Sequence, residues 1–222
     1  MLAVFGAAVV VFAVPRLVAS VISMPADVVA FDIRYDRPVS GRALTTMVEA
    51  DASAQEWHRS PGRLREIAIG SLRLAVVEPD GSQVRQQHLD EALAASTAAL
   101  LRAPADPYMW ITRGTATYLL GRDAATVRAA MAATFRTGRF DPEIYTQRVS
   151  LALTLWESLD AAERARAGEA ARAVAADDVA ALVSLGNDLA TRDRVMQLLA
   201  SQALVRDYLQ ALGEAIDEFS AQ

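Results

Sequence analysis

The 222-residue sequence contains no cysteine and only two histidines, His58 and His88. Without cysteine the chain cannot form disulfides, thiolate nucleophiles, iron–sulfur clusters or cysteine-ligated zinc sites. Zinc needs three or four convergent ligands, and a Ser–His–Asp relay needs a histidine oriented by an acid. Two histidines alone favour neither arrangement, so the sequence predicts no metal site and no catalytic relay.

Lysine is also absent, and all 22 basic residues are arginines. They are outnumbered by 27 acidic residues, which leaves a net charge of -5. Proteins that bind nucleic acid cluster basic charge, and nucleotide-binding proteins carry glycine-rich phosphate loops. Neither G-x-x-x-x-G-K-[ST] nor G-x-G-x-x-G occurs here. We therefore expect no nucleic-acid partner and no cofactor.

Strand patterns are scarce, and no alternation of strands with helices is visible. Hydrophobic residues make up 53% of the chain and charged residues 22%. This composition can bury a core and excludes a mainly disordered protein. The length allows one compact domain, or one repeat array, plus an appendage. The sequence therefore predicts an all-α protein.

The amino terminus has no charge before its sixteenth residue. Met1–Val14 carries no polar side chain, and after Pro15 and Arg16 the apolar character resumes up to Met24. A helix needs about 20 residues to cross the hydrocarbon core of a bilayer. Arg16 lies far enough along the segment for its long side chain to reach the interface. Residues 1–24 are therefore predicted to be a transmembrane anchor.

Two other interpretations of this segment stay open. It also fits a cleaved signal peptide, with Leu2–Val14 as the apolar region and Ser20 or Ala30 before the cut, or a buried core helix. Arginines follow the segment and none precedes it, so the positive-inside rule alone favours a cytoplasmic body.

Residues 25–59 are expected to be a linker and a juxtamembrane helix. Val28–Phe31 in the linker Pro25–Pro38 alternates enough for at most one short strand, whereas Ser40–Trp57 has apolar residues at helical spacing. Residues 60–176 contain helical patterns separated by proline and glycine turns, and residues 177–222 are typical of two or three further helices that cap the array. The helices expected within 60–176 are Arg63–Val77, Val84–Arg102, Tyr108–Leu120, Ala124–Thr137, Pro142–Leu159 and Ala161–Ala175.

The helical patterns repeat. Asp106–Pro107 and Asp141–Pro142 both open a helix and are 35 residues apart, close to the 34-residue unit of a tetratricopeptide repeat. Trp110 and Gly114 follow in the order of that unit, although Arg113 stands where the repeat usually has leucine. We expect a helical-hairpin solenoid over residues 60–176, and the alternative is a non-repetitive helical bundle.

Two stretches, Leu100–Gly121 and Phe135–Asp160, carry a family resemblance. The residues involved are Pro107, Tyr108, Trp110, Thr137, Gly138, Phe140, Pro142, Leu155 and Trp156. This pattern resembles membrane-anchored tetratricopeptide-like proteins encoded with bacterial exopolysaccharide synthesis and export systems. The resemblance implies a membrane helix followed by a periplasmic helical-repeat body, and it brings no catalytic residues.

The first helices of stacked hairpins line a concave face, which is where such proteins bind partners. The side chains expected there are Tyr108, Arg113, Thr115, Tyr118, Tyr145, Arg148 and Trp156. Tyrosine and arginine are enriched at binding hot spots. Trp110, Phe135 and Trp156 equally fit packing between helices.

Together these features predict a non-catalytic, single-pass inner-membrane scaffold with a periplasmic body, holding protein partners of an exopolysaccharide assembly, without a small-molecule substrate. One alternative is an adaptor for another envelope assembly, such as the divisome or cytochrome maturation. Another is an enzyme whose carboxylates converge only in the fold. The scattered carboxylates are interpreted as helix caps or solvated groups: Asp177, Asp178, Asp188, Asp193, Glu214 and Glu218.

Overall fold

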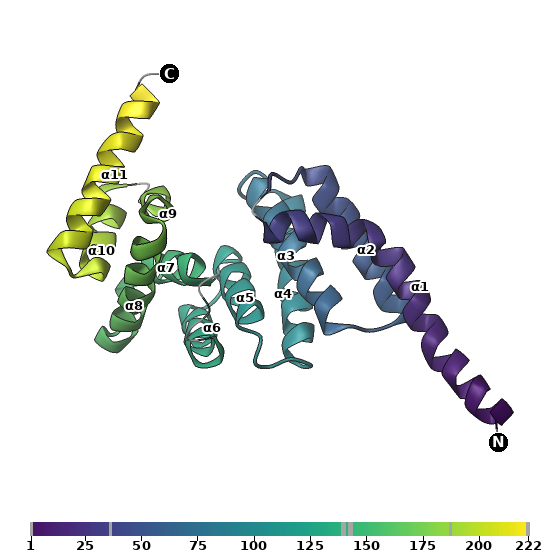
Figure 1. Cartoon of the computed structure of the whole chain (residues 1–222). Coiled ribbons are helices and arrows are strands. Elements are labelled where there is room, and N and C mark those ends of the chain that lie inside the picture. The colour runs from purple at the N-terminus through teal and green to yellow at the C-terminus, as the bar shows by residue number, and fades with distance from the viewer. Residues whose placement is uncertain (1, 36, 139–140, 142–143, 187, 221–222) are drawn as a thin grey trace. The chain divides into compact units, whose positions relative to one another are not determined.

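The computed structural model describes residues 2–35, 37–138, 141, 144–186 and 188–220, and within these the chain is helical and contains no strand. The contacts divide it into two compact units, Met1–Arg122 and Asp123–Gln222. The α-helices, labelled in Figure 1, are α1 (Leu2–Arg34), α2 (Gly41–Trp57), α3 (Pro61–Val77), α4 (Gln83–Leu100), α5 (Pro107–Leu119), α6 (Ala124–Thr137), α7 (Tyr145–Thr154), α8 (Ala161–Asp177), α9 (Val179–Leu185), α10 (Leu189–Leu199) and α11 (Gln202–Ser220). The all-α prediction is confirmed for these residues, and the tetratricopeptide-like stacking stays a prediction.

Helix α1 is longer than predicted. It continues through Pro25 to Arg34, so most of the segment Pro25–Pro38, expected to be a linker with at most one short strand, is helix. The reason is tertiary packing: Ala19, Ser23, Ala26 and Val29 are buried at helical spacing, and α1 packs along α2. Burial of this face outweighs the hydrogen bond that a proline removes from a helix interior.

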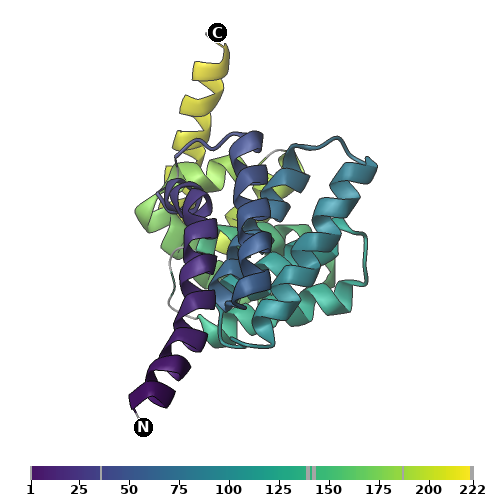
Figure 2. The ribbon, with the colours of Figure 1, turned by 90° about the vertical axis from the view of Figure 1, so that its right-hand side faces the viewer.

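The two halves of α1 differ in their surroundings. The first part projects from the rest of its unit, as Figures 1 and 2 show, and Val10–Val14 and Leu17 are exposed. The 25-residue stretch Val10–Arg34 is long and apolar enough to cross a membrane, with a mean hydropathy of 1.5. Its second part joins the body through the buried face described above.

Helices α1 to α5 pack mainly against their neighbours in the chain, α1 on α2, α2 on α3, α3 on α4 and α4 on α5. Their starts follow local chemistry: the Ser40 and Ser82 hydroxyls accept hydrogen bonds from backbone amides of α2 and α4, and Asp106 caps α5. Their core comprises Ala26, Val29, Leu44, Met47, Val48, Ile67, Ala68, Leu74, Ala95, Ala99, Leu100 and Met109.

In the Asp123–Gln222 unit, α7 packs on α8, α8 on α10, and α9 on α11. The helix expected over Pro142–Leu159 is divided, because α7 ends at Thr154 and a 3-10 turn, Trp156–Ser158, follows. Residues 177–222 form three helices after the end of α8, within the predicted range of two or three. Tyr208 of α11 is fully buried among them.

Candidate functional site

A pocket of about 510 Å³ lies within the Asp123–Gln222 unit, between α6, α7 and α8. Besides two alanines, its lining side chains are Phe135, Arg136, Tyr145, Arg148, Arg166 and Glu169. We refer to it as the arginine pocket. Three cationic side chains against one carboxylate make it locally positive in a chain whose net charge is -5, so it attracts anions.

Arg148 connects two of the helices that line the pocket, α6 and α7. It lies on α7 and is fully buried. Its Nε donates to Thr134 Oγ1 over 3.1 Å, and its Nη2 donates to the carbonyl oxygens of Thr134 and Gly138. These carbonyls lie at the end of α6, where they also accept backbone hydrogen bonds, Thr134 O from Gly138 N over 3.0 Å and Gly138 O from Asp141 N over 3.1 Å. Arg148 therefore caps α6 from the neighbouring helix.

The rest of the Arg148 guanidinium is enclosed by aromatic rings. Its central carbon lies 4.9 Å from the ring centre of Phe135 and 5.7 Å from that of Tyr145. Burial lowers the pKa of Arg148, and Tyr145 and Asp141 act in the opposite direction. An arginine side chain nonetheless stays protonated in proteins. Its Nη1 is buried and has no hydrogen-bond partner among the described residues.

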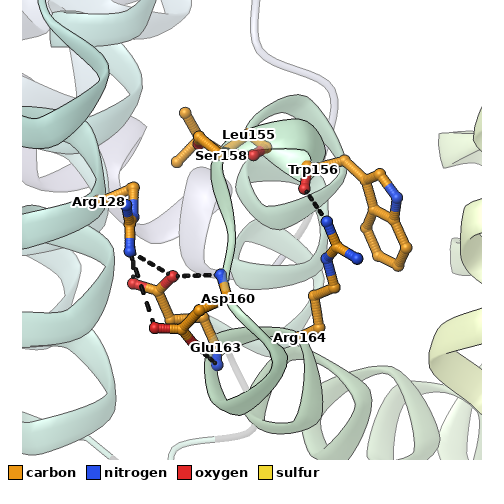
Figure 3. A network of polar contacts seen from close by, with 7 residues as sticks. All are labelled: Arg128, Leu155, Trp156, Ser158, Asp160, Glu163 and Arg164. Carbon is orange, nitrogen blue, oxygen red and sulfur yellow. Dashed lines mark hydrogen bonds and ion pairs between the residues drawn. The ribbon is translucent and has the colours of Figure 1, made fainter.

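Of the seven residues predicted to form a groove, the structure brings Tyr145 and Arg148 together in the arginine pocket. Trp156 is buried in the 3-10 turn, where the Arg164 guanidinium lies 4.7 Å from its ring centre and donates to its carbonyl oxygen over 3.0 Å, as Figure 3 shows. Arg148 and Trp156 therefore have little or no surface exposed to solvent. The environment of Trp156 fits the alternative interpretation, in which this side chain packs between helices.

The other four groove residues lie on α5, in the Met1–Arg122 unit. Tyr108, Arg113 and Thr115 are half-buried and Tyr118 is exposed. The Arg65 guanidinium of α3 lies 4.2 Å from the ring centre of Tyr108, which ties α5 to α3. Since the seven residues are shared between two separate units, a single groove made of all of them stays a prediction.

A second polar cluster joins α6 to the start of α8. Arg128 makes a bidentate contact with Glu163, with Nη2 2.8 Å from Oε2 and Nε 3.3 Å from Oε1. Glu163 also forms a reciprocal capping box with Asp160 at the start of α8 (Figure 3). All three side chains are paired with other residues of the protein, so this cluster stabilises the packing of α6 against the start of α8.

The carboxylates that the sequence analysis interprets as caps or solvated groups have local contacts where contacts are described; Glu214 accepts a hydrogen bond from Gln210 on α11. Asp178 caps α9 and Asp188 caps α10. Hydrogen bonds from Thr191 to the Asp188 carboxylate lower the pKa of that carboxyl. Among the described residues no three acidic or histidine side chains converge as a metal site would require. Glu218 lies outside the residues whose side chains are described.

Sequence reasoning missed one buried acid, Asp51 of α2. Its side chain is fully buried, and neither carboxylate oxygen has a hydrogen-bond partner among the described residues. Arg63 Nε lies 3.9 Å from its Oδ1. The pKa of Asp51 is raised to about 8; burial is the main cause, Glu66 and to a smaller extent Asp27 contribute to the rise, and Arg63 opposes it.

The neighbour Glu66 explains why the carboxylate of Asp51 has no hydrogen-bond partner when Asp51 is ionised. Two ionised carboxylates have no hydrogen to share, whereas protonated Asp51 can donate to Glu66, which is one cause of the raised pKa. The sequence held a signal for this burial, because Asp51 continues the helical spacing of Leu44, Met47 and Val48 and so lies on the apolar face of α2.

Comparison with family models, curated proteins and solved structures gave no match. Similarity therefore assigns neither a family nor an activity to this chain, and its function has to be argued from its own geometry.

Proposed function

We propose that this protein is a membrane-tethered, non-catalytic helical scaffold that holds partner proteins of a cell-envelope assembly close to the membrane. The observation that carries the proposal is α1, one continuous helix that exposes apolar side chains at its start and packs into the body further on. A core helix of a soluble protein would have most of this surface buried. The exposed Val11, Phe12 and Leu17 therefore favour a membrane over a protein core.

Helix length supports the same interpretation. Among the residues of α1 whose burial is described, which begin at Val10, the first buried one is Ala19, and the helix from Leu2 to Val18 precedes it. About 17 residues of helix extend about 25 Å, close to the roughly 30 Å of a bilayer core. In this arrangement Arg16 comes near the body end of the span, where its side chain reaches the interface at little cost.

The end of α2 carries side chains that are typical of a membrane interface. Helix α2 follows α1 after a short connection and packs along it, so it runs back towards the amino terminus and ends at Trp57. Trp57 is 52% exposed, and the next arginine, Arg59, is exposed too. Exposed tryptophan and arginine are typical of the membrane–water interface. They favour a membrane surface near the end of α2.

The packing of α1 also favours an anchor over a cleaved signal peptide. A cut after Ser20 would remove Ala19 from contact with α2, and a cut after Ala30 would remove the whole buried face up to Val29. The hydrophobic surface of α2 would then be open to water. An uncleaved helix keeps this surface covered.

The scaffold role is favoured over the enzyme alternative by the surroundings of the acids. Asp51 is the acid with a raised pKa among the described residues, but its side chain is sealed from solvent. A catalytic acid must reach a substrate. The family resemblance of Leu100–Gly121 and Phe135–Asp160 makes exopolysaccharide synthesis or export the assembly to test first, with an inner-membrane location and a periplasmic body as part of the proposal.

The anchor is tested by membrane fractionation of the full chain. Wild type is expected to stay with membranes after alkaline carbonate extraction, whereas Val11→Arg with Val14→Arg should move into the soluble fraction. Gln197→Arg with Gln202→Arg, at exposed positions of α10 and α11, is the matched control and should behave as wild type. Release of wild type by carbonate, or a mature amino terminus beyond Ser20, would contradict the proposal.

The scaffold role is tested by cross-linking in native membranes with a C-terminal tag, together with external protease on spheroplasts. Recovery of polysaccharide polymerase, export or glycosyltransferase subunits, with the tag digested, is the expected result. A protected tag would contradict the periplasmic location. Recovery of partners from a different envelope assembly would replace the exopolysaccharide assignment.

A further inference from the structure

Arg148 presents an N–H group that the protein does not use. Buried polar groups in proteins are almost always hydrogen-bonded, so the unpartnered Nη1 of a fully buried arginine calls for an explanation. The group belongs to a side chain that lines the arginine pocket. A ligand in that pocket that accepts hydrogen bonds would supply the missing partner.

The guanidinium is held ready for such a ligand. Nε and Nη2 are committed to Thr134 and Gly138, and the rings of Phe135 and Tyr145 lie beside the group. These contacts fix the plane of the guanidinium before a ligand binds. Binding at Nη1 therefore costs no further entropy for orienting the side chain.

Two further arginines enter the pocket from the flanking helices. Arg136 belongs to α6 and Arg166 to α8; both are exposed, and neither forms an ion pair with a described residue. Arg128 and Arg164 nearby, by contrast, both bond to protein oxygens. Arg136 and Arg166 thus add positive charge to the pocket beside Arg148, while Glu169 provides one opposing charge.

We propose that the arginine pocket is a binding site for an oxyanion, the carboxylate or phosphate group of a small ligand. Guanidinium groups match the geometry of both oxyanions. The volume of about 510 Å³ lies within the range of small-molecule sites. Arg148 contacts the anion at the base of the pocket, and Arg136 and Arg166 contact it from the two flanking helices. The site lies within one unit and does not depend on the scaffold role.

The test is equilibrium dialysis of the full chain in detergent with labelled inorganic phosphate and, separately, labelled succinate. Ionic strength is held constant with sodium chloride, because general charge screening must not change between samples. The informative variant is Arg136→Gln with Arg166→Gln, since both side chains are exposed and their loss leaves the packing intact. The matched control is Arg206→Gln, an exposed arginine of α11 outside the pocket.

Wild type and Arg206→Gln are expected to bind at least one probe saturably, and the double variant should bind it at least about tenfold more weakly. Binding of phosphate alone identifies a phosphate ligand, and binding of succinate alone identifies a carboxylate. The proposal is overturned if neither probe binds saturably, or if the double variant binds as tightly as wild type.

Arg148→Gln adds a check on the buried contact. If this variant keeps the helical circular dichroism of wild type, its binding should also be weakened at least about tenfold. Undiminished binding by a folded Arg148→Gln would overturn the assignment of Nη1. If the variant does not fold, the result for Arg136→Gln with Arg166→Gln decides.

Discussion

Among the side chains whose burial is described, each of the two units has one charged side chain that is completely buried, and the surroundings of the two are opposite. Asp51 in the Met1–Arg122 unit has no hydrogen-bond partner among the described residues, whereas Arg148 in the Asp123–Gln222 unit donates to Thr134 and Gly138. An aspartate can escape the cost of burial by taking up a proton, but an arginine cannot lose one. Burial therefore neutralises Asp51, while Arg148 is kept as a cation by acceptors around it.

The largest effect is expected from Asp51→Asn, as a change in pH dependence. Folded Asp51 keeps its proton up to about pH 8, whereas the unfolded chain loses it near the ordinary pKa of 3.8. Between these values the unfolded state binds fewer protons, so wild-type stability falls as pH rises, by up to about 1.4 kcal/mol per pH unit from this group. Asparagine stays neutral, so the variant should lack this decline and be the more stable protein at pH 8.

Urea unfolding in detergent at several pH values between 4 and 8 measures this difference. Glu49→Gln, an exposed acid on the same helix, is the control and should keep the wild-type slope. Parallel pH profiles for wild type and Asp51→Asn would mean that Asp51 is ionised in the folded protein.

The second effect is expected from Arg148→Met, which keeps much of the side-chain volume and removes the donors. The carbonyls of Thr134 and Gly138 at the end of α6 would lose their charged donor and keep only the backbone amides of Gly138 and Asp141. We expect a loss of about 3 kcal/mol in the free energy of unfolding. Chemical denaturation beside Arg206→Met measures it, and a loss below about 1 kcal/mol would show that the buried cation contributes little net stability.

A smaller effect on stability is expected from placing alanine at a glycine where two helices of the same unit approach closely, and one such glycine can be compared in each unit. A Cβ on Gly168 of α8 would lie 2.9 Å from the backbone oxygen of Leu198, whereas one on Gly70 of α3 would meet the side-chain ends of Met47 and Val48. Side chains can move aside more easily than backbone. Gly168→Ala is therefore expected to destabilise by about 1–3 kcal/mol, and Gly70→Ala by less.

Thermal unfolding of both variants makes this comparison. Gly213→Ala on α11 is the control, because its Cβ would meet nothing within 4 Å. It should be stabilising by a few tenths to about 1 kcal/mol, since alanine favours helix over glycine. A stabilising Gly168→Ala would contradict the close approach of α8 and α10.

The smallest effect is expected from Glu163→Gln. Glutamine can still complete the capping box with Asp160, so the variant isolates the ion pair with Arg128. Arg128 is 35% exposed, which screens the pair. We expect a loss of about 0.5–1 kcal/mol that shrinks in high salt. A loss unaffected by salt would assign the effect to the hydrogen bonds instead of the charges.

Local chemistry made much of the helix map predictable. Both ends of α6, Ala124 and Thr137, agree with the prediction, because Asp123 and Gly138 mark them in the sequence. The predicted start of α5, Tyr108, lies only one residue from the observed start, Pro107. The agreement is close because Asp106–Pro107 is a typical helix opening. Signals of this kind act within a few residues, so a single sequence carries them.

The length of α1 could not be predicted in this way. Its continuation past Pro25 depends on Ala26 and Val29 packing against α2, and these partners lie beyond the range of any local pattern. The same limitation affected the groove. Tyr145 and Arg148 were chosen because their residue types suit binding, but only the packing of α6, α7 and α8 puts Arg148 beneath Phe135 in a pocket and encloses Trp156.

The sequence by itself determined the all-α class, most helix ends, the apolar amino terminus and the absence of cysteine and lysine chemistry. These follow from composition and from interactions within one or two helical turns. Only the tertiary structure decided which charges are buried, where α1 joins the body and where three arginines meet. A residue's burial and partners come from segments distant in the chain, so Asp51 and Arg148 acquire their properties only when their helices pack.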